Sequence, residues 1–154
     1  MFDMAPCRMT GRIPPRVPYA KIDWVSIPKG KTETFINPAG FIEQHYIGTL
    51  KLPAIKKAIE ELGKIVEEQK AQKKPALVLI DTSLAATSLF FNTQAHTASI
   101  KGMKTIPLGR AAIFGPLVAQ VTVNTLAMIT GKKDKIRGFT SRQEAIRWLC
   151  AGKS

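Results

Sequence analysis

The residues that could carry out chemistry in this chain centre on His45 and His96, the only histidines among its 154 residues. Neither belongs to an HxxxH or HExxH spacing, and no cluster of acidic residues accompanies either one. Metal sites in proteins usually need three or more such ligands in a compact pattern. We therefore expect no metal site, and no motif in the sequence points to a cofactor.

Asp81 and Ser83 are the other residues that could take part in a reaction. Asp81 ends an apolar run, and Ser83 follows it in a segment rich in Thr, Ser and Ala. A Ser83–His96–Asp81 triad can be drawn, but the chain has no nucleophile elbow and no Gly-rich oxyanion loop. The carboxyl end of a parallel strand is where α/β sheets bind ligands, yet Asp81 is better suited to accepting backbone N–H groups from the residues after it. We expect no enzyme, and a Ser-dependent hydrolase is the weakest alternative.

The composition is that of one globular domain. A chain of 154 residues with 45% hydrophobic residues can bury a single core without disulfides or metals. Cys7 and Cys150 have no CxxC or Cys/His neighbour, so neither a zinc site nor an oxidising compartment is indicated. No apolar run approaches the about 18–20 residues that cross a bilayer. The basic N-terminus lacks the apolar core of a secretory signal, so we expect a cytoplasmic protein.

The net charge of +12 is concentrated in the last third of the chain. Residues 101 to 154 contain ten Lys and Arg residues, and Asp134 and Glu144 are their only acidic residues. Such a field attracts phosphates, anionic lipid headgroups or acidic proteins. A solvated basic surface is the simpler interpretation. A nucleic-acid-associated protein remains an alternative, which an exposed Trp24 would favour.

Proline content and hydrophobic periodicity divide the chain into an arm and one domain. Residues 1–18 hold four prolines, three arginines and no periodicity, which is typical of a poorly ordered basic arm. The remainder, 19–154, is expected to be a single domain. Alternating side chains from Tyr19 to Ser26 predict a strand that pairs with the next one through a turn at 28–31. The further predicted strands are 32–36, 41–47, 76–81, 106–114 and 135–139.

Helices are predicted between and after these strands. The first begins at Pro53, a good first residue for a helix, and shows apolar residues at spacings of three and four. We expect Thr87 or Ser88 to cap the second. Ser141 and Glu144 form a capping box at the start of the last. The predicted helices are 53–72, 89–103, 117–129 and 142–149.

Four segments together resemble a known family. They are VLID at 78–81, AAIFGPLVAQVTVNTLAMITG at 111–131, KIRGF at 135–139 and EAIRWL at 144–149. Over roughly residues 40–150, this succession resembles the STAS-like domains, and in particular their SpoIIAA-like branch of small stand-alone bacterial proteins. The resemblance implies an α/β fold with a mixed sheet of about five strands, three to four helices packed against it, and a C-terminal helix that closes the domain. It also implies a non-enzymatic role in binding or regulation.

The chain departs from the regulatory members of that family after the central strand. Those members carry an Asp-Ser pair there whose serine is phosphorylated, and this chain has no such pair. Phosphorylation near a helix N-terminus would be electrostatically favoured. The hydroxyls available for it are those of Ser83, Thr87 and Ser88.

The helix over 117–129 is the best candidate for an interaction. It is apolar over a wide arc, so a second face must be covered by the helix over 89–103, by a ligand or by a second copy in a homodimer through Leu117 to Ile129. We expect a binding or regulatory module that recognises a protein partner or an apolar-tailed anion. Its predicted pocket has an apolar wall of Phe90, Phe91, Val121 and Met128 and a charged rim of Arg110, Lys132 and Lys133.

Overall fold

The computed structural model describes residues 30–151. The predicted arm at 1–18, the predicted strand from Tyr19 and Trp24 within that strand lie outside the described residues.

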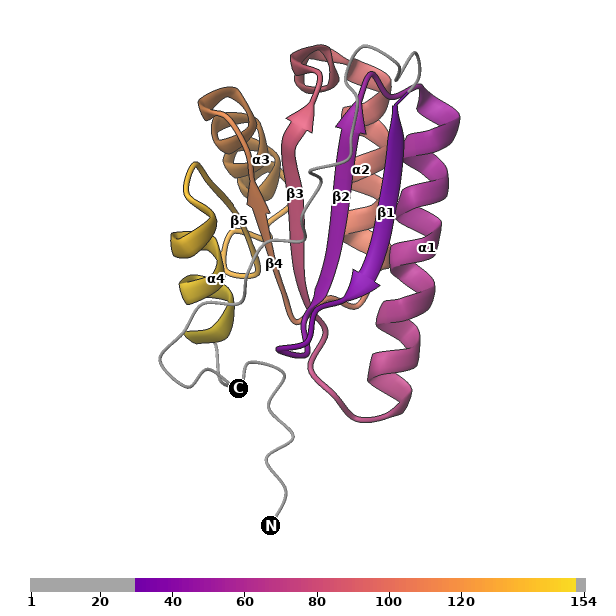
Figure 1. Cartoon of the computed structure of the whole chain (residues 1–154), viewed down its shortest axis with the longest axis vertical. Coiled ribbons are helices and arrows are strands. Elements are labelled where there is room, and N and C mark those ends of the chain that lie inside the picture. Colours follow the sequence, from indigo (N-terminus) through magenta and orange to yellow (C-terminus); the bar gives the residue numbers. More distant parts are fainter. Residues whose placement is uncertain (1–29, 152–154) are drawn as a thin grey trace.

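The described part of the chain forms a five-stranded mixed sheet whose strands follow one another in chain order (Figure 1). The first strand pairs with the second in antiparallel fashion, and every later pair is parallel. The predicted mixed sheet is therefore confirmed. The strands are β1 (Lys31–Ile36), β2 (Ile42–Gly48), β3 (Leu77–Ala85), β4 (Arg110–Phe114) and β5 (Ile136–Phe139).

The helices lie on both faces of this sheet, three on one and one on the other (Figure 1). Each parallel crossover leads from one strand to its next neighbour in the same direction. Because such crossovers are right-handed, their helices are placed on the same face of the sheet. The helix after β5 folds back over the opposite face, where it closes the domain as predicted. The described helices are α1 (Leu52–Ala71), α2 (Thr93–Thr105), α3 (Leu117–Ile129) and α4 (Arg142–Ala151).

The segment between β3 and β4 differs from the prediction. A 3₁₀ helix, η1 (Thr87–Phe91), precedes α2, and the cap of α2 is Asn92. The Asn92 side-chain oxygen accepts hydrogen bonds from the backbone N–H groups of Gln94 and Ala95, each at 3.0 Å. The prediction that Thr87 or Ser88 caps this helix is therefore wrong, because the continuous helix expected there is broken before Asn92.

The last helix begins as predicted. The Ser141 hydroxyl oxygen accepts a hydrogen bond from the backbone N–H of Glu144 at 3.3 Å. Ala145, Ile146 and Leu149 are fully buried against the sheet. The serine half of the predicted capping box is therefore confirmed.

Alternation along the strands gives each face of the sheet its own set of side chains. On β3, Leu77 and Leu79 pack against α4, whereas Val78 and Ile80 pack beneath α1 and α3. The same alternation continues into the polar residues that follow Ile80. As a result, the two faces of the sheet hold two chemically different sites.

Helix α3 lies unusually close to the edge strand β5. A Cβ atom added to Gly138 would lie 2.8 Å from the Cα atom of Gln120 and 2.9 Å from its carbonyl oxygen. Both are backbone atoms, so no side chain can turn aside to make room. The backbone N–H of Gly138 also donates to the Oδ1 atom of Asn124 at 2.9 Å. The small Ala119 and Ala127 lie on the buried face of α3, which permits this approach.

We expect Gly138→Ala to lower the free energy of unfolding by about 1–3 kcal/mol, because the added methyl group must push α3 away from β5. Gly63→Ala is the matched control. A Cβ atom at this position of α1 meets its nearest neighbour, in Ile106, at 3.7 Å, an ordinary contact. Alanine favours a helix over glycine, so Gly63→Ala should stabilise by about 0.5–1 kcal/mol. Urea denaturation measures the free energy of unfolding of both variants. A Gly138→Ala variant as stable as the wild type would contradict the close packing of α3 on β5.

Candidate functional site

A cluster of buried polar side chains lies on the face of the sheet that α4 covers. Its centre is Glu43 on β2, which is fully buried. The Oε1 atom of Glu43 lies 3.0 Å from His45 Nε2 and 3.0 Å from Arg142 Nη1. The Nδ2 atom of Asn37 donates to Oε2. Because an ionised carboxylate only accepts hydrogen bonds, His45 Nε2 carries the hydrogen in this contact.

The partners of Glu43 determine its ionisation. Burial would raise the pKa of this carboxyl group. Hydrogen bonds from His45, Arg142 and Asn37, together with the charge of Arg142, outweigh that effect and lower the pKa from 4.5 to about 2. Glu43 is therefore ionised at neutral pH, and this buried charge joins β2 to the first residue of α4.

The cluster continues across the sheet to β3. His45 is paired in register with Asp81, and its Nδ1 atom lies 3.6 Å from Asp81 Oδ2. The His45 ring stacks on Phe35 with a centroid distance of 5.4 Å. Asp81 Oδ1 accepts the backbone N–H of Ser83 at 2.9 Å and the Ser83 hydroxyl at 2.5 Å. The predicted role of Asp81, accepting a backbone N–H from the residues that follow it, is confirmed.

This geometry does not form a catalytic triad. His96 lines a cavity on the opposite face of the sheet, so the Ser83–His96–Asp81 arrangement that the sequence allows does not form. Ser83 instead donates its hydroxyl to Asp81, whereas a triad serine donates to the histidine that removes its proton. Among residues 30–151, no group of three or more His, Cys, Asp or Glu side chains is arranged to hold a metal ion.

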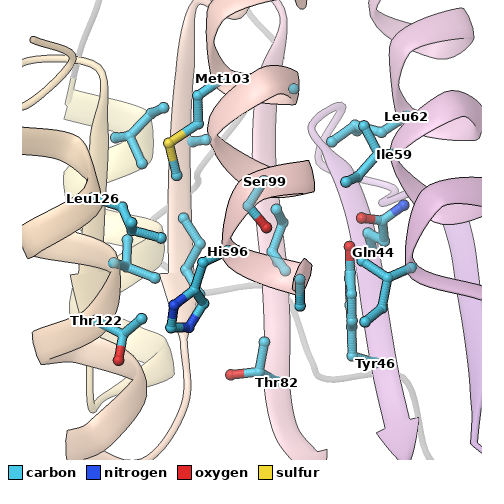
Figure 2. A pocket seen from close by; sticks show the side chains of 18 of the residues that line it. Gln44, Tyr46, Ile59, Leu62, Thr82, His96, Ser99, Met103, Thr122 and Leu126 are labelled. Atoms are coloured by element: carbon cyan, nitrogen blue, oxygen red, sulfur yellow. The ribbon is translucent and has the colours of Figure 1, made fainter. Parts of the chain in front are cut away.

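On the other face of the sheet, a cavity of about 130 Å³ lies beneath α1, α2 and α3 (Figure 2). Its walls come from these helices, from η1 and from strands β2 to β5, and most of the lining side chains are aliphatic. No Lys, Arg, Asp or Glu is among the described residues that line it. The polar lining residues are Gln44, Tyr46, Thr82, His96, Ser99 and Thr122.

Two polar atoms of this cavity are buried without a hydrogen-bond partner within the described part of the chain. They are Oε1 of Gln44 and Nε2 of His96. Gln44 is fully buried, and Figure 2 shows its amide oxygen on the cavity side. The pKa of the neighbouring Tyr46 hydroxyl is raised by burial, so the cavity presents it as a neutral phenol. Buried polar groups are normally paired, so the two unpartnered atoms mark where a bound molecule could add hydrogen bonds.

The structure brings together only part of the pocket wall predicted from sequence. Phe90 is buried and lines the cavity. Phe91, Val121 and Met128 are exposed and do not line it, and the residues that α3 contributes are Thr122, Val123 and Leu126. The residues that α3 buries are Ala119, Val123, Leu126 and Ala127, whereas Val121 and Met128 lie on the opposite, exposed side of the helix.

The predicted charged rim also lies elsewhere. Arg110 and Lys133, together with Met128, line a separate shallow pocket between α3, β5 and α4. Arg110 donates from Nη1 to the backbone oxygen of Trp148 at 2.6 Å, and its guanidinium lies 4.4 Å from the centre of the Trp148 ring. Lys132 lies in the turn after α3. These cations are therefore separated from the apolar cavity.

The candidate phosphorylation sites are not at the start of α2. Ser83 lies within β3 and is half-buried, while Thr87 and Ser88 belong to η1. Ser88 is exposed. The N-terminus of α2 begins at Thr93 and is already capped by Asn92.

The second apolar face of α3 is uncovered within the part of the chain that the structure describes. Leu117 is 65%, Val121 57% and Met128 71% exposed. Of the three coverings that the sequence leaves open, the helix over 89–103 does not cover these side chains, because α2 lies over the cavity that the buried face of α3 also lines. None of the described helices combines the length and apolar character that a membrane span requires.

Sequence reasoning singled out His45 as a residue that could do chemistry, but it missed Glu43 and Gln44, which shape the two sites most strongly. Glu43 and His45 alternate with Gln44 in a strand whose flanking residues are apolar, and three successive polar residues in a central strand are the signal that could have revealed them. Asn37 lies between β1 and β2, and Arg142 is the first residue of α4. No sequence pattern indicates that both reach Glu43.

A solved structure similar to this chain is that of an uncharacterised protein of the DUF3478 family with a SpoIIAA-like fold, from Shewanella loihica PV-4. The two are 18% identical, the match covers 79% of this chain and 95% of that one, and the TM-score is 0.54. No protein-family model and no curated protein matches this chain. The chain therefore has the SpoIIAA-like fold predicted from its sequence, and at this identity the likeness shows the fold alone.

The buried Glu43 predicts an acid-dependent loss of stability. Its pKa is lower in the folded protein than in the unfolded chain, so its contribution is complete above pH 4.5 and is lost as the pH falls toward 2. A shift of this size corresponds to about 3 kcal/mol. In Arg142→Gln the pKa of Glu43 should rise toward 4.5, which flattens the acid-dependent loss.

Urea denaturation from pH 7 to pH 2.5 measures this effect, and the side-chain carboxyl ¹³C shift of Glu43 reports its pKa directly. Lys31→Gln is the control, because Lys31 pairs with Glu33 at 2.9 Å on the exposed surface and should leave the profile unchanged. Parallel profiles for the wild type and Arg142→Gln would show that Arg142 does not hold Glu43 ionised.

Proposed function

We propose that this protein is a non-enzymatic binding module that takes a small apolar molecule into the cavity beneath α1, α2 and α3. The observation that carries the proposal is an apolar cavity of about 130 Å³ lined by no charged side chain among the described residues. Apolar cavities of about 150 Å³ stay dry and bind benzene or xenon. The SpoIIAA-like fold is compatible with a non-enzymatic regulatory module.

The arrangement of polar groups supports binding rather than catalysis. In the buried cluster, Ser83 donates to Asp81, and the contacts of Glu43 are with the donors His45, Arg142 and Asn37. The single proton of the Ser83 hydroxyl is donated to Asp81, and not to the histidine that acts as the base in a serine triad. The cluster instead connects the strands to α4.

The nucleic-acid alternative has less support from the described residues. Trp148 lies beside Arg110, but its ring contacts both the Arg110 guanidinium and the Phe139 ring, whose centroid is 5.6 Å away. Base stacking on single strands uses aromatic faces that are open. The basic surface alone gives attraction without a specific binding mode.

Ligand binding to the cavity should raise the melting temperature of the wild type. At ten times its dissociation constant, toluene should stabilise the fold by about 1.4 kcal/mol, a rise of about 3–5 °C for a domain of this size. Ser99→Leu places a larger side chain into the cavity and should abolish the rise. Thr97→Leu adds the same side chain at an exposed position of α2 and should retain it. If toluene raised the melting temperature of both variants equally, toluene would bind outside the cavity.

A second interaction, with another copy of this chain, is supported by the uncovered face of α3. Leu117, Val121 and Met128 form one stripe along this helix, and each is more than half exposed. In a two-fold symmetric contact the same patch serves both copies. If the two α3 helices run antiparallel, the basic turn at 132–135 of one copy lies beside the other copy's Leu117, which keeps the cations of the two copies apart.

Analytical ultracentrifugation tests this self-association. We expect the wild type to dimerise at tens of micromolar and Val121→Lys to weaken the dimer at least tenfold, because the symmetric contact would bury two ammonium groups. Gln143→Lys adds the same charge at an exposed position of α4 and should not change the association. A wild type that stays monomeric at this concentration would rule out α3 as a homodimer interface.

A further inference from the structure

We infer that the ligand of this cavity is an uncharged, ring-sized molecule that donates a hydrogen bond to Gln44. This inference rests on the proposed function, because it names the chemical class of ligand that the same cavity takes. The cavity, the orientation of the Gln44 amide and the absence of lining charge each limit the ligand in a different way.

The orientation of the Gln44 amide is determined by its contacts. Its Nε2 atom donates to the backbone oxygen of Ala58 in α1 at 2.8 Å and to the hydroxyl oxygen of Thr34 at 3.1 Å. A backbone carbonyl only accepts, so the nitrogen must point toward α1 and the oxygen must point the other way. Figure 2 shows the amide oxygen on the cavity side and the nitrogen on the side of α1.

The Gln44 oxygen therefore needs a donor that the described protein does not supply. Gln44 is fully buried, and its Oε1 atom has no hydrogen-bond partner within the described residues. A buried acceptor left unpaired is costly, so a ligand that donates to it gains more than an ordinary hydrogen bond between exposed groups would give. A hydroxyl or N–H group on the ligand satisfies this requirement, whereas an ether or a bare hydrocarbon does not.

His96 offers a second polar contact from the opposite wall. Its Nε2 atom is buried and unpartnered among residues 30–151, and the ring reaches into the cavity from α2 (Figure 2). A neutral imidazole nitrogen donates or accepts according to its tautomer, so it adapts to the oxygen or nitrogen of the ligand. One hydroxyl or N–H group on an otherwise apolar ligand is the simplest match to these two walls.

The cavity excludes a charged headgroup. No Lys, Arg, Asp or Glu is among its described lining residues, and the Arg110 and Lys133 side chains line a different pocket. Burying an unpaired carboxylate or ammonium group is far more costly than burying a hydroxyl that gains a hydrogen bond. The apolar-tailed anion that the sequence suggested therefore fits this cavity less well than a neutral molecule.

The volume of the cavity limits the ligand to about one ring. A volume of about 130 Å³ is slightly below the about 150 Å³ that accommodates benzene in an engineered cavity. A long acyl chain does not fit without movement of the helices. Phenol-like and small cyclic alcohol ligands combine the required size, neutrality and donor.

The experiment compares phenol, toluene, anisole and benzoate as probes of the whole wild-type chain at pH 7, with dissociation constants from ligand-observed NMR. Phenol donates a hydrogen bond, anisole accepts one without donating, toluene does neither, and benzoate is charged. We expect phenol to bind at least fivefold more tightly than anisole, and benzoate not to bind. Gln44→Met, which removes the acceptor while keeping a similar length, should reduce the preference for phenol over toluene at least fivefold. Gln143→Met makes the same substitution at an exposed position of α4, so it is the control and should retain that preference.

The outcomes separate this inference from the proposed function. If toluene binds and phenol has no advantage over anisole, the cavity binds ligands but the donor requirement is wrong. If benzoate binds more tightly than phenol, the requirement for a neutral ligand is wrong. If none of the four probes binds, the proposed function fails together with the inference. The comparison of phenol with anisole needs only the wild type, so it decides the donor requirement even if Gln44→Met does not fold.

Discussion

The structure depends on how strand β2 satisfies three successive polar residues in its interior. β2 lies between β1 and β3, and Glu43, Gln44 and His45 are all buried. A buried carboxylate is stable only with several donors, and Glu43 receives them from His45 beside it, from Asn37 before the strand and from Arg142 at the start of α4. The charge of Glu43 therefore binds both the C-terminal helix α4 and the turn between β1 and β2 to strand β2.

The same alternation explains why the opposite face of the sheet holds a cavity. Gln44 points away from Glu43, and α1 satisfies only one side of its amide. The side chains that α2 presents toward the cavity include the small residues Ala95, Ser99 and Gly102. A Cβ atom added to Gly102 would lie 3.0 Å from a side-chain carbon of Ile59, so α2 is held close to α1 while its short side chains leave volume beneath it. The cavity thus follows from small residues on one helix.

The sequence predicts the fold better than the sites. The uniform apolar run before Asp81 and the Ser141 cap of the last helix are local patterns, and both are present in the structure. Which residues line a site depends on which face of each helix or strand is buried, and this is not a local pattern. Apolar residues lie on all sides of α3, so their periodicity does not predict which side of the helix is buried. In the structure, α3 packs the side that comes closest to β5 at Gly138. The contacts of Glu43 with Asn37 and Arg142 join distant segments, and no local pattern encodes them.

The basic residues near the C-terminus illustrate the difference between charge and function. The sequence suggested one amphipathic site, with Arg110 as a ligand-binding cation at the rim of an apolar pocket. In the structure, Arg110 packs on the Trp148 ring and donates to its backbone oxygen, and Arg142 donates to Glu43. Both arginines connect α4 to the sheet, which is a structural use of positive charge. These cations act on α4, whereas no Lys, Arg, Asp or Glu is among the described residues that line the cavity beneath α1, α2 and α3. The ligand that we propose for this cavity is therefore selected by shape and by one buried acceptor, and not by net charge.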